Sequence, residues 1–492
     1  MDPGSVVPEA LRSGLGSLAA YLAAHVLLCL VPAFFIAGGL SALVPKEAIT
    51  RFLGRNAPKV VAYPAATAAG SLLAVCSCTI VPLFAGIFKK GAGLGPAITF
   101  LFFAPAANIL ALAYTGAALG AEFAAARLIL SLLFGVGIGL IMALVFSEDD
   151  IAHARETDTS FAGRGGLRAA TVALLLLLLA LLVAGTLKVG LLLDAYGTLT
   201  LPVSGLDRLE ELLRHLVPFD SARGEEGVSA QGAILIVLLA LLAFAAPLGL
   251  GKVDAGFSGW TWIALGLVAL TLVVAAVGME PRPGGLEIRL TGKLLGVVVA
   301  MAAIGYVARR WFDAFEVQQW LWETWRFVRQ IFPILVVGVF AVGVIRVFIR
   351  PEWVELVAGS NTVPANLLGV LFGVFMYFPT LVEVPVAKMF LSLGMHPGPL
   401  LAYLMADPEL SLQSILITAS IIGRRKAWTY VGWVALFSTI AGLTFGAWID
   451  GAGAWSLALW LALFFAALVL ALWLVERRQV TAGAARTVPG GE

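Results

Sequence analysis

Charged residues are scarce in this chain of 492 residues, since Asp, Glu, Lys and Arg together make up 13% of it. A soluble globular protein has about a quarter charged residues and is about half apolar. Here 60% of the residues are hydrophobic, which excludes an ordinary soluble domain. The formal net charge of +2 is also too small to predict a nucleic-acid partner.

Cysteine is rare, and a nucleotide-binding loop is missing. Three cysteines cannot form a disulfide framework. The pattern Gly-x-x-x-x-Gly-Lys-Ser/Thr occurs nowhere, so we expect no ATPase within the chain and no cofactor. Uphill transport would then need an ion gradient or a separate ATPase partner. The N-terminus lacks a basic region and the first apolar run is long, which predicts no cleavable signal peptide.

The chain has instead a series of apolar runs of about 20 residues, the length that crosses a bilayer. We therefore expect an all-α polytopic membrane protein in the plasma (inner) membrane, with membrane lipid as a partner. The predicted full-length spans lie near residues 17–44, 58–77, 122–146, 167–193, 233–251, 260–279, 294–306, 327–349, 363–378, 427–449 and 455–475. Gly and Pro interrupt segments 79–119 and 382–422, which predicts broken hairpins, either two short crossings or a re-entrant loop.

Basic residues between the spans predict the orientation of the chain. Residues 424–426 and 477–478 are basic and flank the last two spans, so the positive-inside rule places the C-terminus in the cytoplasm and the N-terminus outside. The loop 193–231 then lies outside, and its leucines predict a short surface helix at 206–216. The Trp-rich segment 313–325 is predicted to lie at the membrane interface.

Glycines and prolines recur at a constant spacing in the two hairpins. Pro82 and Pro385 are separated by 303 residues (385 − 82), and so are Pro105 and Pro408. Together with the orientation, this repeat predicts two inverted repeats with the substrate site at their interface, a common transporter design. The predicted organisation is an N-terminal segment (1–16), a first repeat (17–150), a linker with about four membrane helices (151–324), a second repeat (325–451), a final span (452–478) and a disordered tail (479–492).

The first hairpin carries thiols, Cys76 and Cys78. Residues two apart point to nearly opposite sides of a regular helix. We therefore expect the two thiols to share one ligand only if the chain is unwound from Cys76 to Pro82, with Thr79 and Pro82 completing the substrate site. Thiolates select soft centres such as arsenic(III), antimony(III) or a soft metal cation. The alternative is that both cysteines pack as small apolar side chains.

The second hairpin carries ionisable groups instead of thiols. Charged groups at membrane depth usually line a pathway or form a proton relay. We assign proton coupling to Glu383, Asp407 and Glu409, because a protonated carboxyl can donate to a backbone carbonyl that a proline such as Pro408 leaves unbonded. A Glu383–Lys388 ion pair is the alternative, and it would leave Asp407 as the candidate.

Two polar residues share the repeat spacing at the ends of the hairpins. Asn108 and Ser411 are 303 residues apart. They follow Pro105 and Pro408, and we expect them to satisfy the backbone groups that these prolines free. We also include both in the predicted substrate site.

These residues resemble a known family. Segments 76–86, 91–99 and 104–108 look like the signature of the ArsP-type predicted permeases, and 383–385 with 408–412 is similar to that family's second hairpin. The resemblance covers roughly a fifth of the chain. Characterised members export trivalent organoarsenicals such as methylarsenite, and their cysteines are implicated in transport.

The residues and the resemblance together predict a secondary efflux permease, not an enzyme, for a small thiophilic substrate, most specifically a trivalent organoarsenical. Two other functions stay open. The cysteines of a membrane thiol redox protein would react rather than bind and release, and an importer of a sulfur compound such as thiosulfate would use the same soft chemistry in the opposite direction. The repeat favours transport over redox chemistry, which needs no inverted symmetry.

Overall fold

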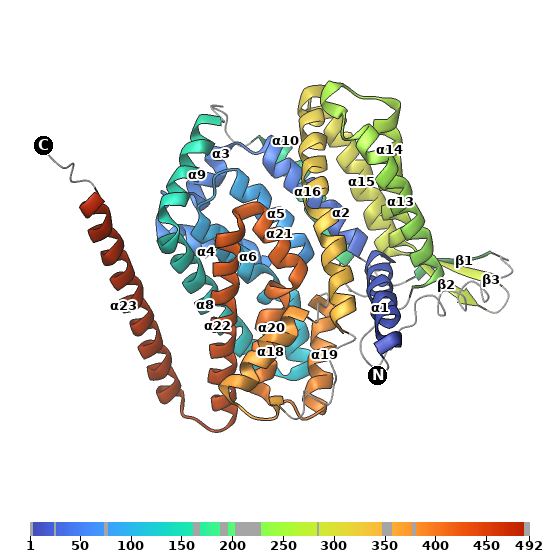
Figure 1. Ribbon diagram of the computed structural model, residues 1–492. Coiled ribbons are helices and arrows are strands. Elements are labelled where there is room, and N and C mark those ends of the chain that lie inside the picture. Colours follow the sequence, from blue (N-terminus) through green and yellow to red (C-terminus); the bar gives the residue numbers. More distant parts are fainter. Residues whose placement is uncertain are drawn as a thin grey trace, which may run out of the picture.

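The protein is nearly all helical in the computed structural model (Figure 1). The structure describes residues 3–23, 26–72, 77–160, 168–186, 195–201, 228–282, 285–346, 357–375 and 380–486. Within these residues seven helices are long and apolar enough to cross a membrane, or up to nine if each bent pair is one span. A polytopic helical membrane protein, as the sequence predicts, accounts for this composition.

The helices fall into a first group, a linker and a second group along the chain. The first group contains α1 (Pro3–Ala23), α2 (Val26–Leu43), α3 (Lys46–Leu53), α4 (Lys59–Leu72), α5 (Ser77–Lys89), α6 (Leu94–Ala106), α7 (Ile109–Leu119), α8 (Ala121–Val145) and α9 (Ser147–Ser160). The linker contains α10 (Ala169–Thr186), β1 (Ala195–Leu201), α13 (Ala230–Gly249), η2 (Val253–Ala255), α14 (Gly259–Ala276), β2 (Gly278–Arg282), β3 (Gly285–Thr291) and α15 (Gly292–Trp311). The second group contains α16 (Ala314–Arg346), α18 (Val363–Phe375), α19 (Thr380–Ser392), α20 (Pro397–Leu410), α21 (Leu412–Ile422), α22 (Arg424–Ile449) and α23 (Ala454–Arg486).

A small β-sheet in the linker corrects the expectation of an all-α fold. Its strands are antiparallel in the order β1-β3-β2, and they project from the helical bundle beside α13 (Figure 1). The apolar residues Leu286, Ile288 and Leu290 alternate with Glu287 and Arg289, a period of two that favours a strand. The expected surface helix at 206–216 lies outside the described residues.

Two helices are longer than expected. α16 is one continuous helix of 33 residues, so the predicted interfacial segment at 313–325 is its first part. Trp320 in that part is 4% exposed and donates from its indole Nε1 to the backbone oxygen of Phe35 at 2.8 Å. It therefore packs against α2 instead of anchoring at lipid headgroups. α23 continues to Arg486, into the tail for which we expected disorder.

Each broken hairpin forms three short helices, and the two sets correspond. α5 and α19 have 13 residues each, and α7 and α21 have 11 each. The turns before α6 and α20 contain Gly91 and Gly394 with φ of 89° and 88°, a region that glycine adopts without steric cost. α6 packs against α4 and α8, and α20 packs against α18 and α22. Across the two groups, α5 contacts α21 and α19 contacts α7.

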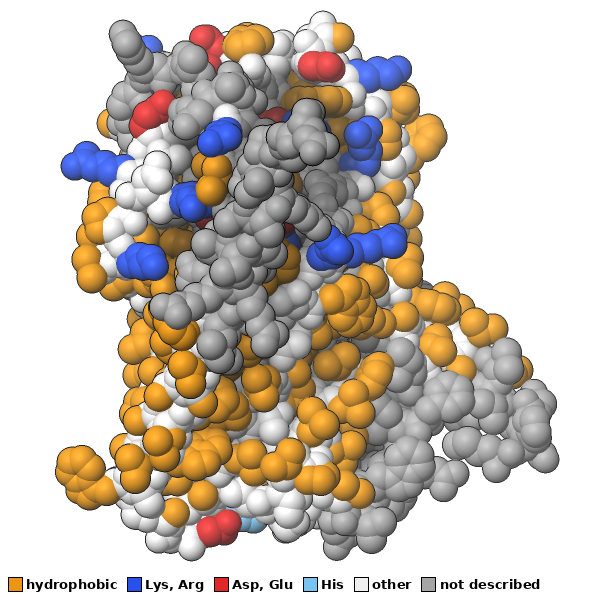
Figure 2. Space-filling model, turned by 60° about the vertical axis from the view of Figure 1, so that its left-hand side comes forward, with side chains coloured by type: hydrophobic (Ala, Val, Ile, Leu, Met, Phe, Trp, Pro, Cys, Tyr) orange, Lys and Arg blue, Asp and Glu red, His pale blue; other side chains and the backbone are white. Residues whose placement is uncertain are grey.

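The core and the outer surface differ as expected for a protein in a bilayer. All residues of α6 and those of α20 from Gly398 to Leu410 are buried, so these two helices form the centre of the bundle. On the face shown in Figure 2, Lys, Arg, Asp and Glu side chains gather at one end, and hydrophobic side chains cover the broad middle. A surface of this kind suits contact with lipid.

Candidate functional site

The predicted thiol site begins where α5 begins. α4 ends at Leu72 and α5 starts at Ser77. Cys76 lies outside the described residues, and so does the side chain of Cys78. Thr79, in the first turn of α5, is fully buried.

The prediction that the chain is unwound as far as Pro82 is wrong, because α5 is helical from Ser77 through Pro82. A proline at this position removes only the hydrogen bond to the carbonyl of residue 78, in the first turn of the helix. Pro82 is buried among the residues of the bundle core. Any shared ligand of the two thiols therefore depends on the chain before Ser77.

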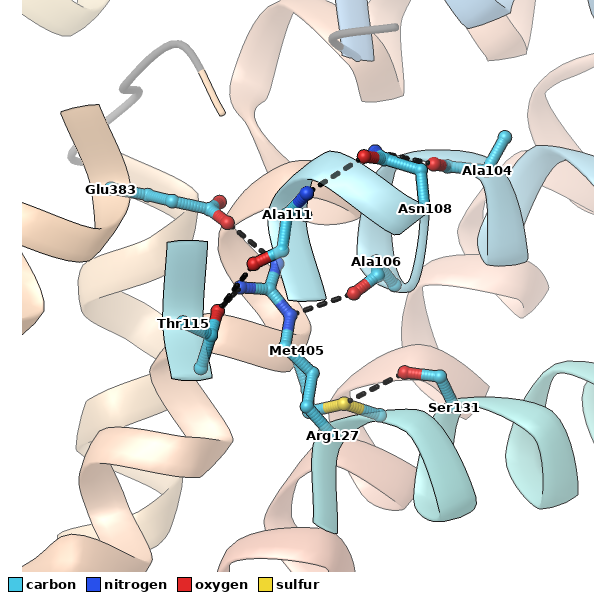
Figure 3. Close-up of polar contacts among 9 residues, drawn as sticks. All are labelled: Ala104, Ala106, Asn108, Ala111, Thr115, Arg127, Ser131, Glu383 and Met405. Atoms are coloured by element: carbon cyan, nitrogen blue, oxygen red, sulfur yellow. Dashed lines mark hydrogen bonds and ion pairs between the residues drawn. The ribbon is translucent and has the colours of Figure 1, made fainter. Parts of the chain in front are cut away.

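Asn108 connects α6 to α7. Its side-chain oxygen accepts a hydrogen bond from the backbone N–H of Ala111 at 2.8 Å and caps α7, and its amide nitrogen donates to the carbonyl of Ala104 at 2.9 Å (Figure 3). Asn108 thus satisfies backbone groups at the end of α6 and the start of α7, and neither of them is the Leu101 carbonyl that Pro105 leaves without its helical donor. At the equivalent break, the Ser411 hydroxyl donates to that of Ser414 at 2.8 Å.

Arg127 forms a network that the sequence analysis missed. Its side chain is fully buried on α8 and donates to Glu383 Oε1 at 2.5 Å, to the carbonyl of Ala106 at 2.6 Å and to Thr115 Oγ1 at 3.0 Å (Figure 3). Glu383 lies on α19, so this ion pair joins the two groups of helices. An unpaired charge at such depth would be costly, and the pair offsets that cost. Lys388 is exposed, which overturns the alternative Glu383–Lys388 pair.

Asp407 and Glu409 lie on the central helix α20. Asp407 is fully buried and interacts with Glu383. Gly373 of α18 packs directly against it, since a Cβ atom added there would lie 2.7 Å from the Asp407 backbone nitrogen. Glu409 is 4% exposed, and its Oε2 accepts a hydrogen bond from the Tyr430 hydroxyl at 2.6 Å. The carboxyl groups assigned from the sequence are therefore buried at the interface of the two groups of helices.

The repeat spacing relates the surroundings of these carboxyl groups. Tyr430 follows Arg127 by 303 residues, Thr418 follows Thr115 by 303, and Glu409 follows Ala106 by 303. We call Arg127, Thr115, Ala106 and Glu383 the first cluster, and Tyr430, Thr418, Glu409 and Ser414 the second cluster. The first cluster contains an internal cation and the second contains a tyrosine hydroxyl in its place. A lone Arg127 within an apolar run was the sequence signal for the first cluster.

A further set of charges joins α5 to α16. Lys89, the last residue of α5, forms an ion pair with Glu323 of α16, and the Ser41 hydroxyl donates to the same carboxylate at 3.1 Å. Lys90 lies in the turn between α5 and α6, outside both helices, and burial lowers its pKa to about 8. The described residues contain no group of three or more His, Cys, Asp and Glu side chains able to hold a metal ion.

Comparisons with known proteins match most of the chain. A model of the ArsP_1 predicted permease family matches residues 13–447. The UPF0718 protein MJ0584 of Methanocaldococcus jannaschii is 30% identical over 452 residues, covering 91% of this chain and 98% of the relative. The UPF0718 protein YraQ of Escherichia coli K12 is 25% identical over 186 residues, covering 37% of this chain and 50% of the relative. No solved structure matches. The family match over nearly the whole chain, together with the apolar helices, shows that the protein belongs to the ArsP_1 predicted permease family and is a multi-pass membrane transporter.

Proposed function

We propose that this permease exports a small thiophilic substrate, most specifically a trivalent organoarsenical, and that Cys76 and Cys78 bind it. The observation that carries the proposal is that Cys78, two residues after Cys76 in the sequence, lies in the first turn of α5, a helix that is buried from Thr79 to Phe88 and packs against α2, α6 and α21. Thiolates bind arsenic(III) strongly because both are soft. A thiophilic substrate would thus be held beside helices from both groups.

The correspondence between the two hairpins supports the transport part of the proposal. The corresponding lengths, glycine turns and packings of the two hairpins follow the 303-residue spacing. We propose that the two groups are related by a pseudo-two-fold axis in the membrane plane, with the C-terminus in the cytoplasm and the N-terminus outside. The site at their interface then opens to each side in turn.

Proton coupling is assigned to Asp407 and Glu383. Glu383 forms an ion pair with Arg127 and also interacts with Asp407. Two neighbouring carboxyl groups repel each other when both are charged, so a proton on one of them relieves the repulsion. Loading and release of that proton would bias the interface between its two arrangements, as an antiporter requires.

The proposal is tested by a metalloid sensitivity panel in cells that lack their own arsenic exporters. Expression of the wild-type protein should raise resistance to trivalent methylarsenic, and the Cys76→Ser/Cys78→Ser double variant should lose that resistance at equal protein level. Cys29→Ser is the matched control, because Cys29 lies in a separate apolar run, and it should keep resistance. Equal resistance in the double variant would overturn the thiol mechanism.

The same cells separate the two other functions. An importer would sensitise them or increase uptake of thiosulfate. A thiol redox protein would leave metalloid accumulation unchanged and alter the oxidation state of cellular thiols.

A further inference from the structure

The second cluster forms the polar part of the lining of a narrow pocket, and apolar side chains form the rest. Ser414 and Thr418 of α21, Glu409 of α20 and Tyr430 of α22 contribute polar side chains, and the apolar lining residues include Ile80 of α5. The pocket therefore lies where helices of both groups meet. Its polar lining carries one carboxylate and three hydroxyl groups.

Glu409 is incompletely paired in this pocket. Its side chain is 4% exposed, and only Oε2 is used, by the hydroxyl of Tyr430 at 2.6 Å. Among the residues that the structure describes, Oε1 has no hydrogen-bond partner. A buried carboxylate without a cation costs several kcal/mol in a low-dielectric interior, by an order-of-magnitude account. A proton on the carboxyl group, or a cation from outside the chain bound beside it, would remove this cost.

The first cluster shows what fills the equivalent space. There the guanidinium of Arg127 contacts Thr115 and the carbonyl of Ala106 and neutralises Glu383. In the second cluster the residue at the Arg127 position is Tyr430, which brings an oxygen instead of a cation. Glu383 lies close enough to Glu409 for the two carboxyl groups to interact electrostatically, but the positive charge of Arg127 compensates the charge of Glu383.

We propose that the second cluster binds a sodium ion through Glu409, Ser414, Thr418 and Tyr430. Hard oxygen donors suit a hard cation, and none of the described residues that line the pocket brings sulfur or imidazole, the donors that soft metals prefer. Divalent calcium sites usually combine several carboxylates with other oxygen ligands, whereas this lining has one. Sodium sites in transporters occupy this kind of place, beside interrupted helices at a repeat interface. Binding at this site does not depend on the identity of the exported substrate.

The experiment measures binding of radioactive sodium to the purified full-length protein in detergent, at constant ionic strength with choline chloride as the replacement salt. The wild type should show saturable binding and a rise in melting temperature with NaCl that choline chloride and KCl do not give. Glu409→Gln should lower the affinity at least ~10-fold, as expected for loss of a charged ligand. Glu122→Gln, an exposed glutamate at the start of α8, is the matched control and should bind as the wild type does.

A second variant keeps the test decisive if Glu409→Gln folds poorly. Tyr430→Phe removes one hydroxyl ligand and keeps the ring, and it should weaken sodium binding several-fold, about 1 kcal/mol or less. Sodium binding at wild-type affinity in both variants would overturn the proposal, as would a wild type that binds no sodium and responds only to pH. If the wild-type protein binds sodium but gives cells no resistance to trivalent methylarsenic, the proposed function would be contradicted and the sodium site would stand.

Discussion

Three residues of the first cluster, Arg127, Thr115 and Ala106, are equivalent by the repeat spacing to Tyr430, Thr418 and Glu409 of the second cluster, but the two clusters differ in charge. Arg127 satisfies Glu383, Thr115 and a backbone carbonyl within the first cluster. Tyr430 gives Glu409 one hydrogen bond and no charge. The same backbone plan thus supports one cluster whose cation is built into the chain and one whose carboxylate lacks such a partner among the described residues.

This difference suggests a division of work between the two clusters. The buried ion pair holds α8 and α19 together while Glu383 is ionised, because separating it would strand two charges in the interior. A carboxylate with an exchangeable cation can respond to ion concentration. Substitutions in either cluster, or in the helix packing and turns that the two groups share, test this difference.

The largest effect is expected at Arg127. Arg127→Leu leaves Glu383 buried without its cation and should lower the free energy of unfolding by about 3–5 kcal/mol. Thermal unfolding of the purified protein in detergent, with the yield of monodisperse protein, is the measurement. The double variant Arg127→Leu/Glu383→Leu should recover much of the loss, because an apolar pair strands no charge. A double variant as unstable as the single one would argue against the ion pair as the cause.

Two glycines test whether the packing is shared. A Cβ atom added at Gly139 would lie 2.6 Å from the Gly95 carbonyl oxygen, and one added at Gly442 would lie 2.6 Å from that of Gly398. Each Gly→Ala substitution should therefore destabilise the protein by about 1–3 kcal/mol through overpacking. Melting temperatures of the two variants should fall by similar amounts. A loss at only one position would break the correspondence between the two groups.

A smaller effect is expected at Tyr430. Tyr430→Phe removes the single hydrogen bond that Glu409 receives from a described residue. With choline chloride as the only salt, the substitution should lower the free energy of unfolding by about 1 kcal/mol. Thermal unfolding at matched salt is the measurement, and Tyr306→Phe, on the exposed surface of α15, is the control. A loss of unfolding free energy as large as that of Arg127→Leu would mean that the two clusters contribute equally to stability, which would contradict the difference described above.

The smallest effect concerns the two hairpin turns, in which Lys90 corresponds to Leu393. Burial lowers the pKa of Lys90 to about 8 from an unfolded value of 10.5, so the folded state disfavours the charged form. Stability should then rise as the pH increases from about 8 to 10.5, where the unfolded chain still binds a proton that the folded chain has released. Lys90→Leu should flatten this part of the melting-temperature profile. An unchanged profile would contradict the burial of a charged Lys90.

Much of the fold could be predicted from the sequence, because apolar runs and helix breakers act locally. Several of the predicted spans, such as 122–146 and 427–449, coincide with helices long and apolar enough to cross a membrane, whereas others, such as 58–77 and 363–378, correspond to shorter helices. Glycines such as Gly91 and Gly394 mark the division of each hairpin. The sheet was missed because Leu286, Ile288 and Leu290 alternate within a short segment that a 20-residue window averages away. Pro82 was overinterpreted, since a proline near a helix start removes few hydrogen bonds.

The candidate site was harder to predict, because its contacts join residues far apart in the chain. Glu383 was assigned correctly as a buried ionisable group, but its partner Arg127 lies 256 residues away on another helix. No local pattern selects that partner over Lys388, which is five residues away. The repeat spacing would have paired Arg127 with Tyr430 and drawn attention to both positions.

Export through a thiol site is tested most directly by transport into everted membrane vesicles. Vesicles containing the wild-type protein should accumulate trivalent methylarsenic when a pH gradient is imposed, and a protonophore should stop the accumulation. The Cys76→Ser/Cys78→Ser variant should accumulate none at equal protein content, whereas Cys29→Ser should match the wild type. Accumulation by the double variant at the wild-type rate would contradict the claim.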